Sequence, residues 1–249
     1  MIGQVIAETP WEIQRLGKFT ASCIDALLTE PKSAEAKKKG DLSEIAKTYI
    51  RGRAAEIITG TIREVTNSYM EWGRQYEPDA AALLKELYPS MQFASMDSPT
   101  FFKYSDFAGG SPDGWDKENK LVAEIKCPED PANHVEYCLI VNAAELKKVQ
   151  RDYYHQIQMN MLCVAKKFGV EFHEMKGIFA SYCPLVADGY LKLKIIEIFP
   201  DMEFYEKIHP ALSKAEDYLA DIIYSLIQKN GQNNSIAVKD ITSIPLIKL

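Results

Sequence analysis

Residues 121–127 read Leu-Val-Ala-Glu-Ile-Lys-Cys, and this run constrains the fold more than any other stretch of the chain. Its apolar and β-branched residues, broken by charges at alternate positions, are typical of a β-strand. Because strand side chains alternate between faces, Glu124 and Lys126 share one face with Val122. The opposite face is wholly apolar and consists of Leu121, Ala123, Ile125 and Cys127.

The turn sequence Ser111-Pro112-Asp113-Gly114 precedes this strand. The segment 101–128 combines aromatic and β-branched residues with Gly, Pro and Asp-Lys-Glu-Asn turn signals and predicts a β-hairpin. If the hairpin brings Asp113 beside Glu124, two carboxylates and the Lys126 ammonium converge. Two carboxylates a few ångströms apart repel unless a divalent cation lies between them, and oxygen-only ligands favour Mg²⁺ or Mn²⁺ over zinc. A lysine beside such an ion can orient or deprotonate a water, or offset charge in the transition state of phosphodiester hydrolysis.

The same three residues also allow a purely structural interpretation. Ser-Pro-Asp-Gly is a good β-turn without any catalytic role, and Glu-x-Lys on an amphipathic strand is usually a solvated face. Asp113, Glu124 and Lys126 alone therefore do not decide between a hydrolase site and a surface hairpin.

The whole chain predicts one α/β domain over residues 1–229, a small mixed β-sheet flanked by helices, with a partly ordered C-terminal tail over 230–249. Helices are expected over 20–28, 41–60, 71–87, 151–169 and 201–229, with Asp41 as an N-cap, Gly60 as a stop and an interruption or kink near Pro210. Strands are expected over 176–183 and 190–199, and a polar surface loop over 30–40.

Composition restricts the class of protein. With 29 basic and 35 acidic residues, the net charge of −6 argues against a protein that coats nucleic acid by charge alone. It does not exclude an enzyme that acts on DNA, because carboxylates that bind metal ions contribute to the negative charge of the bare sequence. The five cysteines form no Cys-x-x-Cys pair and the four histidines show no metal-ligand spacing, so neither a disulfide framework nor a zinc site is indicated. No stretch approaches the roughly 20 apolar residues that cross a bilayer, and we expect a soluble, unexported protein.

Four stretches carry a more specific signal. In chain order they are WEIQRLGKFTAS (11–22), EWGRQYEPDA (71–80), GGSPDG with LVAEIKCP (109–128) and YYHQIQMNML (153–162). Together they resemble the PD-(D/E)XK nuclease superfamily and, within it, the phage lambda exonuclease family, also called the YqaJ-type viral recombinases. The resemblance implies a restriction-endonuclease-like α/β core.

The resemblance implies catalytic roles at the matching positions. Asp113 and Glu124 would be metal ligands, the carbonyl of Ile125 a further ligand, and Lys126 the catalytic lysine. Glu77 is similar to the glutamate that a helix delivers to a second metal ion, partly through water. Taken alone, Glu77 is equally a surface glutamate at a helix start.

Gln156 resembles the glutamine that orients the site in this family. Taken alone, it is a polar boundary residue beside an apolar helix stripe, paired with Asn160 one turn on. The neighbouring His155 is expected to lie on a helix face and not to act as a general base.

A further group of residues matches family positions associated with the terminal phosphate of the strand being degraded. These residues are Arg15, Ser22 and Ser111, and a guanidinium fork with hydroxyl donors suits phosphate oxygens. Taken alone, Arg15 is a surface arginine and Ser22 a helix cap. Lys32 stands where the lambda enzyme has an arginine near DNA, so a point charge replaces a planar fork there.

The function that the resemblance implies is a Mg²⁺-dependent exonuclease, with Mn²⁺ as a substitute and two ions per site. It would degrade linear double-stranded DNA from the 5′ end to mononucleotides and leave 3′ single strands for recombination by annealing. The family further implies a homotrimeric ring around DNA, a single-strand annealing protein as partner and a phage or prophage protein in the bacterial cytoplasm. An endonuclease of the same superfamily and a catalytically silent DNA-binding protein of the same fold are the alternatives.

Overall fold

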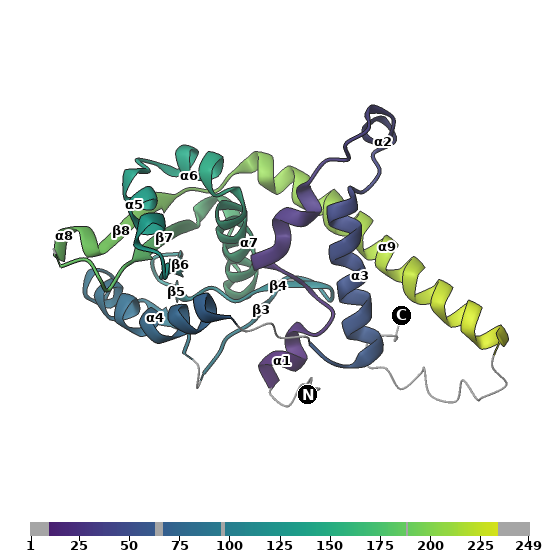
Figure 1. Cartoon of the computed structure of the whole chain (residues 1–249), viewed down its shortest axis with the longest axis horizontal. Helices are drawn as coiled ribbons and strands as arrows, with labels where there is room; N and C mark the ends of the chain where they lie inside the picture. The colour runs from purple at the N-terminus through teal and green to yellow at the C-terminus, as the bar shows by residue number, and fades with distance from the viewer. Residues whose placement is uncertain (1–9, 63–66, 96–97, 188, 234–249) are drawn as a thin grey trace. The chain divides into compact units, whose positions relative to one another are not determined.

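The computed structural model describes residues 10–62, 67–95, 98–187 and 189–233 (Figure 1). The chain forms two compact units, each described here by itself. The first consists of Met1–Phe19, Ala26–Arg63 and Glu206–Leu249, and the second of Thr20–Asp25 and Glu64–Tyr205. Most of the predicted tail, residues 234–249, lies outside the described residues. The prediction of one domain over 1–229 stays a prediction.

The helices, in chain order, are α1 (Pro10–Arg15), the 3₁₀ helix η1 (Ala21–Leu28), α2 (Ala34–Lys39), α3 (Glu44–Thr59), α4 (Ser68–Leu87), α5 (Pro131–Leu139), α6 (Ala143–Val149), α7 (Arg151–Phe168), η2 (Phe172–Glu174), α8 (Gly189–Lys192) and α9 (Met202–Asn233). The strands are β1 (Phe19–Thr20), β2 (Gln92–Phe93), β3 (Phe102–Lys103), β4 (Ala108–Gly110), β5 (Gly114–Asp116), β6 (Leu121–Lys126), β7 (Lys176–Tyr182) and β8 (Leu193–Ile198).

The second unit is built on a mixed sheet that, within the described residues, has five strands in the order β2-β5-β6-β7-β8 (Figure 1). Strands β5 and β6 form an antiparallel hairpin in which Trp115 faces Val122, which confirms the predicted hairpin. Strand β6 pairs in parallel with β7, because helices α5 to α7 carry the chain back across the sheet between them. The predicted small mixed sheet flanked by helices is therefore confirmed.

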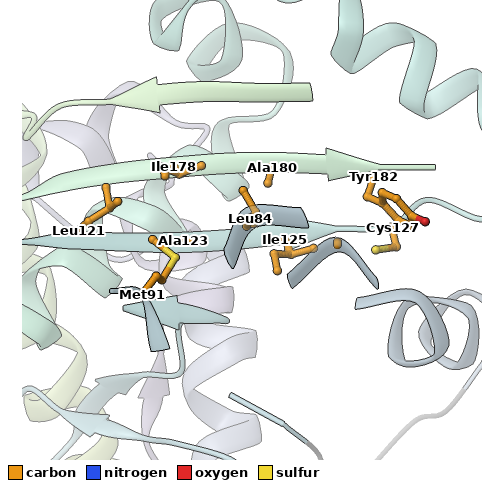
Figure 2. Packing of buried hydrophobic residues seen from close by; sticks show 10 residues of the cluster. Leu84, Met91, Leu121, Ala123, Ile125, Cys127, Ile178, Ala180 and Tyr182 are labelled. Carbon is orange, nitrogen blue, oxygen red and sulfur yellow. The ribbon is translucent and has the colours of Figure 1, made fainter. Parts of the chain in front are cut away.

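One face of this sheet carries the apolar side chains that the alternation in 121–127 predicted. Figure 2 shows Leu121, Ala123 and Ile125 of β6, and Cys127 directly after it, with residues of β7, beside Leu84 of α4 and Met91. Leu84 and Met91 are fully buried in this cluster. Helix α4 therefore covers the apolar face, and burial of this area stabilises the unit at about 25 cal/mol per Å².

Helix α7 covers the opposite face of the sheet, the face that carries Glu124. Its residues from Tyr154 to Ala165 are all buried. Gly177 of β7 permits the close approach, since a Cβ at this position would lie 2.5 Å from the Ile157 side chain. Glu124 consequently points toward a buried helix and not toward solvent, whereas Lys126 is half-buried.

The first unit is mainly helical. In α3, the Ser43 hydroxyl caps the N-terminus by accepting the Ala46 N–H (3.0 Å), and Gly60 ends the helix in the left-handed conformation. The buried carboxylate of Glu56 accepts the Gly17 N–H (3.0 Å) and pairs with Arg53 (2.7 Å). This pairing ties the backbone that follows α1 to α3.

Several local predictions are wrong in detail. The cap of α3 is Ser43 and not Asp41, because Ser43 is the extended residue that immediately precedes the helix. The segment 30–40 is not a loop throughout, since Ser33 caps α2, which an i,i+4 pair between Lys39 and Glu35 supports. Residues 21–28 form a 3₁₀ helix rather than an α-helix.

The elements later in the chain depart from prediction in fewer places. Helix α4 begins at Ser68 and includes Pro78 in its interior, while α9 continues without interruption through Pro210. The first residues of the predicted strand 190–199 belong to α8, and β8 begins at Leu193, where it pairs with Tyr182. In the part of the chain that the structure describes, no helix has the length and apolar character to cross a membrane.

Candidate active site

Asp113 lies in the connection between β4 and β5, and hydrogen bonds tie it to β6. Its backbone N–H donates to the carbonyl of Ala123 (3.1 Å), and its Oδ2 accepts the backbone N–H of Ile125 (2.6 Å). These two bonds bracket Glu124. The turn that carries one carboxyl group is therefore fixed against the strand that carries the other.

Glu124 is a buried carboxylate with a hydrogen bond to each oxygen. It is 2% exposed. Its Oε1 accepts from Lys126 Nζ (2.6 Å) and Gln156 Nε2 (2.5 Å), and its Oε2 accepts from Asn160 Nδ2 (3.1 Å). The interpretation of Glu-x-Lys as a solvated face is thus wrong for Glu124, because α7 covers this side of the sheet.

Lys126 stands between Glu124 and an aromatic ring. Its Nζ lies 4.8 Å from the centroid of the Tyr153 ring, and that ring stacks on Phe179. Burial alone would lower the pKa of Lys126, but the charges of Glu124 and Asp113 raise it above its ordinary value. The neighbouring carboxyl groups therefore favour the protonated form of this lysine.

The carboxyl groups of the site influence one another. Burial, with the nearby Asp113 charge, raises the pKa of Glu124 to about 8 and that of Glu77, on α4, to about 7. Burial also raises the pKa of Asp113. The site thus gathers more negative charge than Lys126 compensates, a condition that a bound cation would relieve.

The donors fit a hard divalent cation. Among the described residues, no three His, Cys, Asp or Glu side chains are arranged to hold a metal ion by themselves. Mg²⁺ does not require such a cage, because it keeps several waters and is commonly bound through one or two carboxylates. Asp113 and Glu124 offer oxygen donors only, and they lie in a site with excess negative charge. The ligand roles of Asp113, Glu124, Glu77 and the Ile125 carbonyl stay predictions.

Gln156 and Asn160 lie one turn apart on α7 and both donate to Glu124. The interpretation of Gln156 as a boundary residue that pairs with Asn160 is wrong, since each amide binds a different carboxylate oxygen. Asn160 was not among the site residues predicted from the sequence. The sequence feature that marks Asn160 is its i,i+4 spacing from Gln156 on an otherwise apolar helix face. This spacing does not reveal that both amides donate to Glu124, because Glu124 lies on a strand far away in the sequence.

Ser22 and Ser111 come from adjoining stretches of backbone. A Cβ at Gly110 would lie 3.1 Å from the Cβ of Ala21, so these two residues are in close contact, and each precedes one of the serines. Ser22 is exposed in η1, and its hydroxyl lies 3.2 Å from that of Thr20. Ser111 is half-buried, two residues before Asp113. Their binding of a phosphate stays a prediction.

Arg15 and Lys32 belong to the first unit. Arg15 is the last residue of α1, and its guanidinium lies 4.3 Å from the centroid of the Trp11 ring. Lys32 is exposed just before α2. Their predicted contacts with DNA stay predictions.

His155 and His134 have structural partners. The Nδ1 of His155 lies 2.7 Å from Asp25 Oδ1. Arg151 donates to both carboxylate oxygens of Asp25. This cluster joins the start of η1 to α7. His134 is buried between the Ser181 hydroxyl and the Leu191 carbonyl, each at 2.8 Å.

Comparisons with known proteins agree with this fold. The chain resembles an alkaline exonuclease from Laribacter hongkongensis, with a TM-score of 0.68 and 23% identity over 90% of this chain and 98% of that one. A structure of the same enzyme with dAMP gives a TM-score of 0.67 at 24% identity, covering 90% and 98% of the two chains. A phage-related exonuclease from Haemophilus somnus 129PT gives 0.64 at 19% identity, covering 84% and 96%. No curated protein matches the sequence significantly.

The fold is thus the PD-(D/E)XK type of α/β fold that these exonucleases share. The sequence profile of the YqaJ-like viral recombinase domain matches residues 10–167. The chain belongs to this family, and its membership implies a nuclease.

Proposed function

We propose that the chain is a Mg²⁺-dependent 5′-to-3′ exonuclease that degrades one strand of linear double-stranded DNA. Its products would be mononucleotides and a 3′ single strand that is competent for recombination by annealing. The observation that carries this proposal is the buried Glu124 carboxylate, which lies beside Asp113 and is paired with Lys126 (2.6 Å). A buried acidic pair with a neighbouring ammonium is costly for stability alone and suits phosphodiester hydrolysis.

The residues of the chain take separate tasks in this proposal. Asp113, Glu124 and the Ile125 carbonyl would hold one ion, and Glu77 would reach a second one through water. Bound Mg²⁺, or Mn²⁺ in its place, would lower the pKa of a water and screen phosphate charge. Gln156 donates to Glu124 and keeps its carboxylate oriented.

Lys126 would act through its charge. The charges of Glu124 and Asp113 raise its pKa and favour the protonated form. A protonated lysine can donate to a phosphate oxygen and offset the negative charge that develops during hydrolysis. We therefore assign charge stabilisation to Lys126.

The recognition of a 5′ end would fall to hydroxyl and guanidinium donors. The close contact of Ala21 with Gly110 supports a shared role for Ser22 and Ser111, because it brings the backbone of both serines together. Arg15 would add a planar fork for the phosphate, and Lys32 a point charge near the duplex.

Linear duplex DNA is the proposed substrate, and a homotrimeric ring is the proposed assembly. A ring would convert weak backbone contacts into retention on DNA and so into processive digestion. Light scattering tests this directly, since a mass near 28.2 kDa would contradict the ring and about three times that mass would support it. A single-strand annealing protein is the proposed partner on the exposed 3′ strand.

The experiment that tests the function compares three substrates in Mg²⁺: a linear duplex labelled at its 5′ ends, the same duplex labelled at its 3′ ends, and closed circular DNA. The proposal predicts labelled mononucleotides at early times from the 5′ label alone, with circles intact. Early release of the 3′ label would contradict the direction. Nicked circles would identify an endonuclease, and binding without cleavage would identify a catalytically silent binder.

A further inference from the structure

We propose that Asn160 is a positioning residue of the nuclease site, which fixes the Glu124 carboxylate against the backbone that leads to Asp113. This inference rests on the proposed function, because it assigns a task within the same reaction. It concerns a residue that touches neither substrate nor cation and acts through Glu124.

Asn160 donates to the one Glu124 oxygen that accepts from neither Lys126 nor Gln156. Lys126 and Gln156 both donate to Oε1, whereas Asn160 Nδ2 donates to Oε2 (3.1 Å). Two amides one turn apart on one helix therefore hold the two ends of the carboxylate. A carboxylate held at both oxygens cannot rotate about its last side-chain bond, so its lone pairs keep one direction.

The other side of the Asn160 amide is confined by β4. Asn160 is 1% exposed, and its Oδ1 has no hydrogen-bond partner among the described residues. A Cβ at Gly110 would lie 2.2 Å from this oxygen, so the amide is packed directly against the Gly110 backbone. The amide cannot exchange its nitrogen and oxygen without turning the oxygen toward the Glu124 carboxylate.

Asn160 thereby links the two segments that carry the carboxyl groups. Gly110 ends β4, three residues before Asp113, and Glu124 lies on β6. A buried acceptor without a partner is unfavourable, and Asn160 keeps one while its Nδ2 holds Glu124 Oε2. Such a cost is consistent with a positioning task for the amide.

The test uses Asn160→Leu, which keeps the branched shape in a larger side chain and removes the donor, and Asn160→Ala, which removes both donor and volume. Gln158→Leu is the matched control. Gln158 is a buried amide of the same helix, but it donates to the Phe199 carbonyl (2.9 Å) and accepts the Asp201 N–H (3.0 Å), away from the site. The readouts are kcat, KM for linear duplex, and Mn²⁺ affinity by calorimetry in the absence of DNA.

Loss of a residue that orients a metal ligand commonly lowers activity or metal affinity by about 10–100-fold. Both Asn160 variants should show a loss of this size in kcat or Mn²⁺ affinity, with KM for DNA within about twofold of wild type. Gln158→Leu should lose stability but retain wild-type kcat and Mn²⁺ affinity when folded. Wild-type kcat and Mn²⁺ affinity in either folded Asn160 variant would overturn the proposal.

A second pair of variants tests the link to Gly110 independently. Gly110→Ala places a methyl group against Asn160 Oδ1 and should impair kcat as Asn160→Ala does. In the double variant the added methyl group no longer meets the amide and keeps only its contacts with Ala21 Cβ (3.1 Å) and Cys163 Sγ (3.3 Å), so the two losses should combine to less than their product. Losses that multiply in the double variant would overturn the link. If wild type cleaves no DNA, the proposed function fails. The Mn²⁺ affinities of wild type and the Asn160 variants, measured by calorimetry, still show whether Asn160 positions Glu124.

Discussion

Lys126 is held from two sides, because its Nζ donates to Glu124 Oε1 at 2.6 Å and lies 4.8 Å from the centroid of the Tyr153 ring. The ring is itself supported by stacking on Phe179 (6.0 Å, 21°). Tyr153 therefore presents an electron-rich face to the ammonium group that we assign to charge stabilisation.

Tyr153→Leu should lower kcat for linear duplex by about two- to fivefold, because a cation–π contact contributes about 0.5–1 kcal/mol and each factor of ten corresponds to about 1.4 kcal/mol. Tyr153→Phe keeps the ring face and should retain kcat close to wild type. Single-turnover rates of the three proteins measure this effect. Equal rates for the leucine variant and wild type would show that the ring does not position Lys126.

Removal of metal should make the stability of the protein fall as pH rises. The folded protein holds protons on Glu124, with a pKa of about 8, and on Glu77, with a pKa of about 7, that the unfolded chain releases near 4.5. Because the unfolded state binds fewer protons between pH 5 and 8, the free energy of unfolding decreases across this window, by about 1.4 kcal/mol for each pKa unit.

Chemical denaturation in chelator at pH 5.5 and 8, repeated with Mg²⁺, checks this prediction. Mg²⁺ should restore stability more at pH 8 than at pH 5.5, since it replaces the protons. Glu124→Gln should flatten the dependence on pH. A wild-type protein whose stability in chelator does not change between these pH values would contradict the charge balance of the site.

The cluster of Asp25 with Arg151 and His155 should stabilise the second unit. Burial alone would raise the pKa of Asp25, but the hydrogen bonds from His155 and Arg151 lower it to about 2. The stabilisation is present above the ordinary pKa of 3.8 and is lost as pH falls toward 2.

Asp25→Asn should therefore reduce the free energy of unfolding at pH 7 by about 1–2 kcal/mol, and by less at pH 3. Asp152→Asn is the control, because Asp152 is an exposed acid in the first turn of the same helix. Denaturant titration of both variants at the two pH values makes the comparison. An equal effect of the two substitutions at pH 7 would rule out a specific role for the cluster.

Arg15→Ala should reduce the preference of the enzyme for a 5′-phosphate over a 5′-hydroxyl end, since it removes a bidentate donor for phosphate. Arg51→Ala, an exposed arginine of α3, should leave the preference intact. Initial rates on duplexes that differ only in the 5′ group provide the measurement. Wild-type rates that are equal on the two ends would refute the assignment.

The parts of the fold that could be predicted are those with a strong local period. The alternation in 121–127 predicted which residues of β6 face the core, and Figure 2 shows these side chains gathered there. By contrast, the segment 30–40 was interpreted as a loop from its polarity, although the helix-favouring residues between Ser33 and Gly40 form α2. Polarity reports exposure, and exposure does not exclude a helix.

The parts of the site that escaped prediction depend on partners far away in the sequence. Asn160 lies 36 residues from Glu124, and Arg151 lies 126 residues from Asp25. No local pattern records such pairs. Gln156 was found only through resemblance to a family, because its own sequence context is equally that of a boundary residue. Long-range packing, and not propensity, decides what these side chains do.

The most direct measurement is the rate of mononucleotide release from a linear duplex by wild type, Lys126→Ala and Glu124→Gln, in Mg²⁺ and in chelator. Lys167→Ala, an exposed lysine of α7, serves as the control. The account predicts that both site variants fold, bind duplex and lose about 10²–10⁴-fold in rate, and that chelator abolishes release by wild type. Near wild-type release by Lys126→Ala, or undiminished release in chelator, would contradict it.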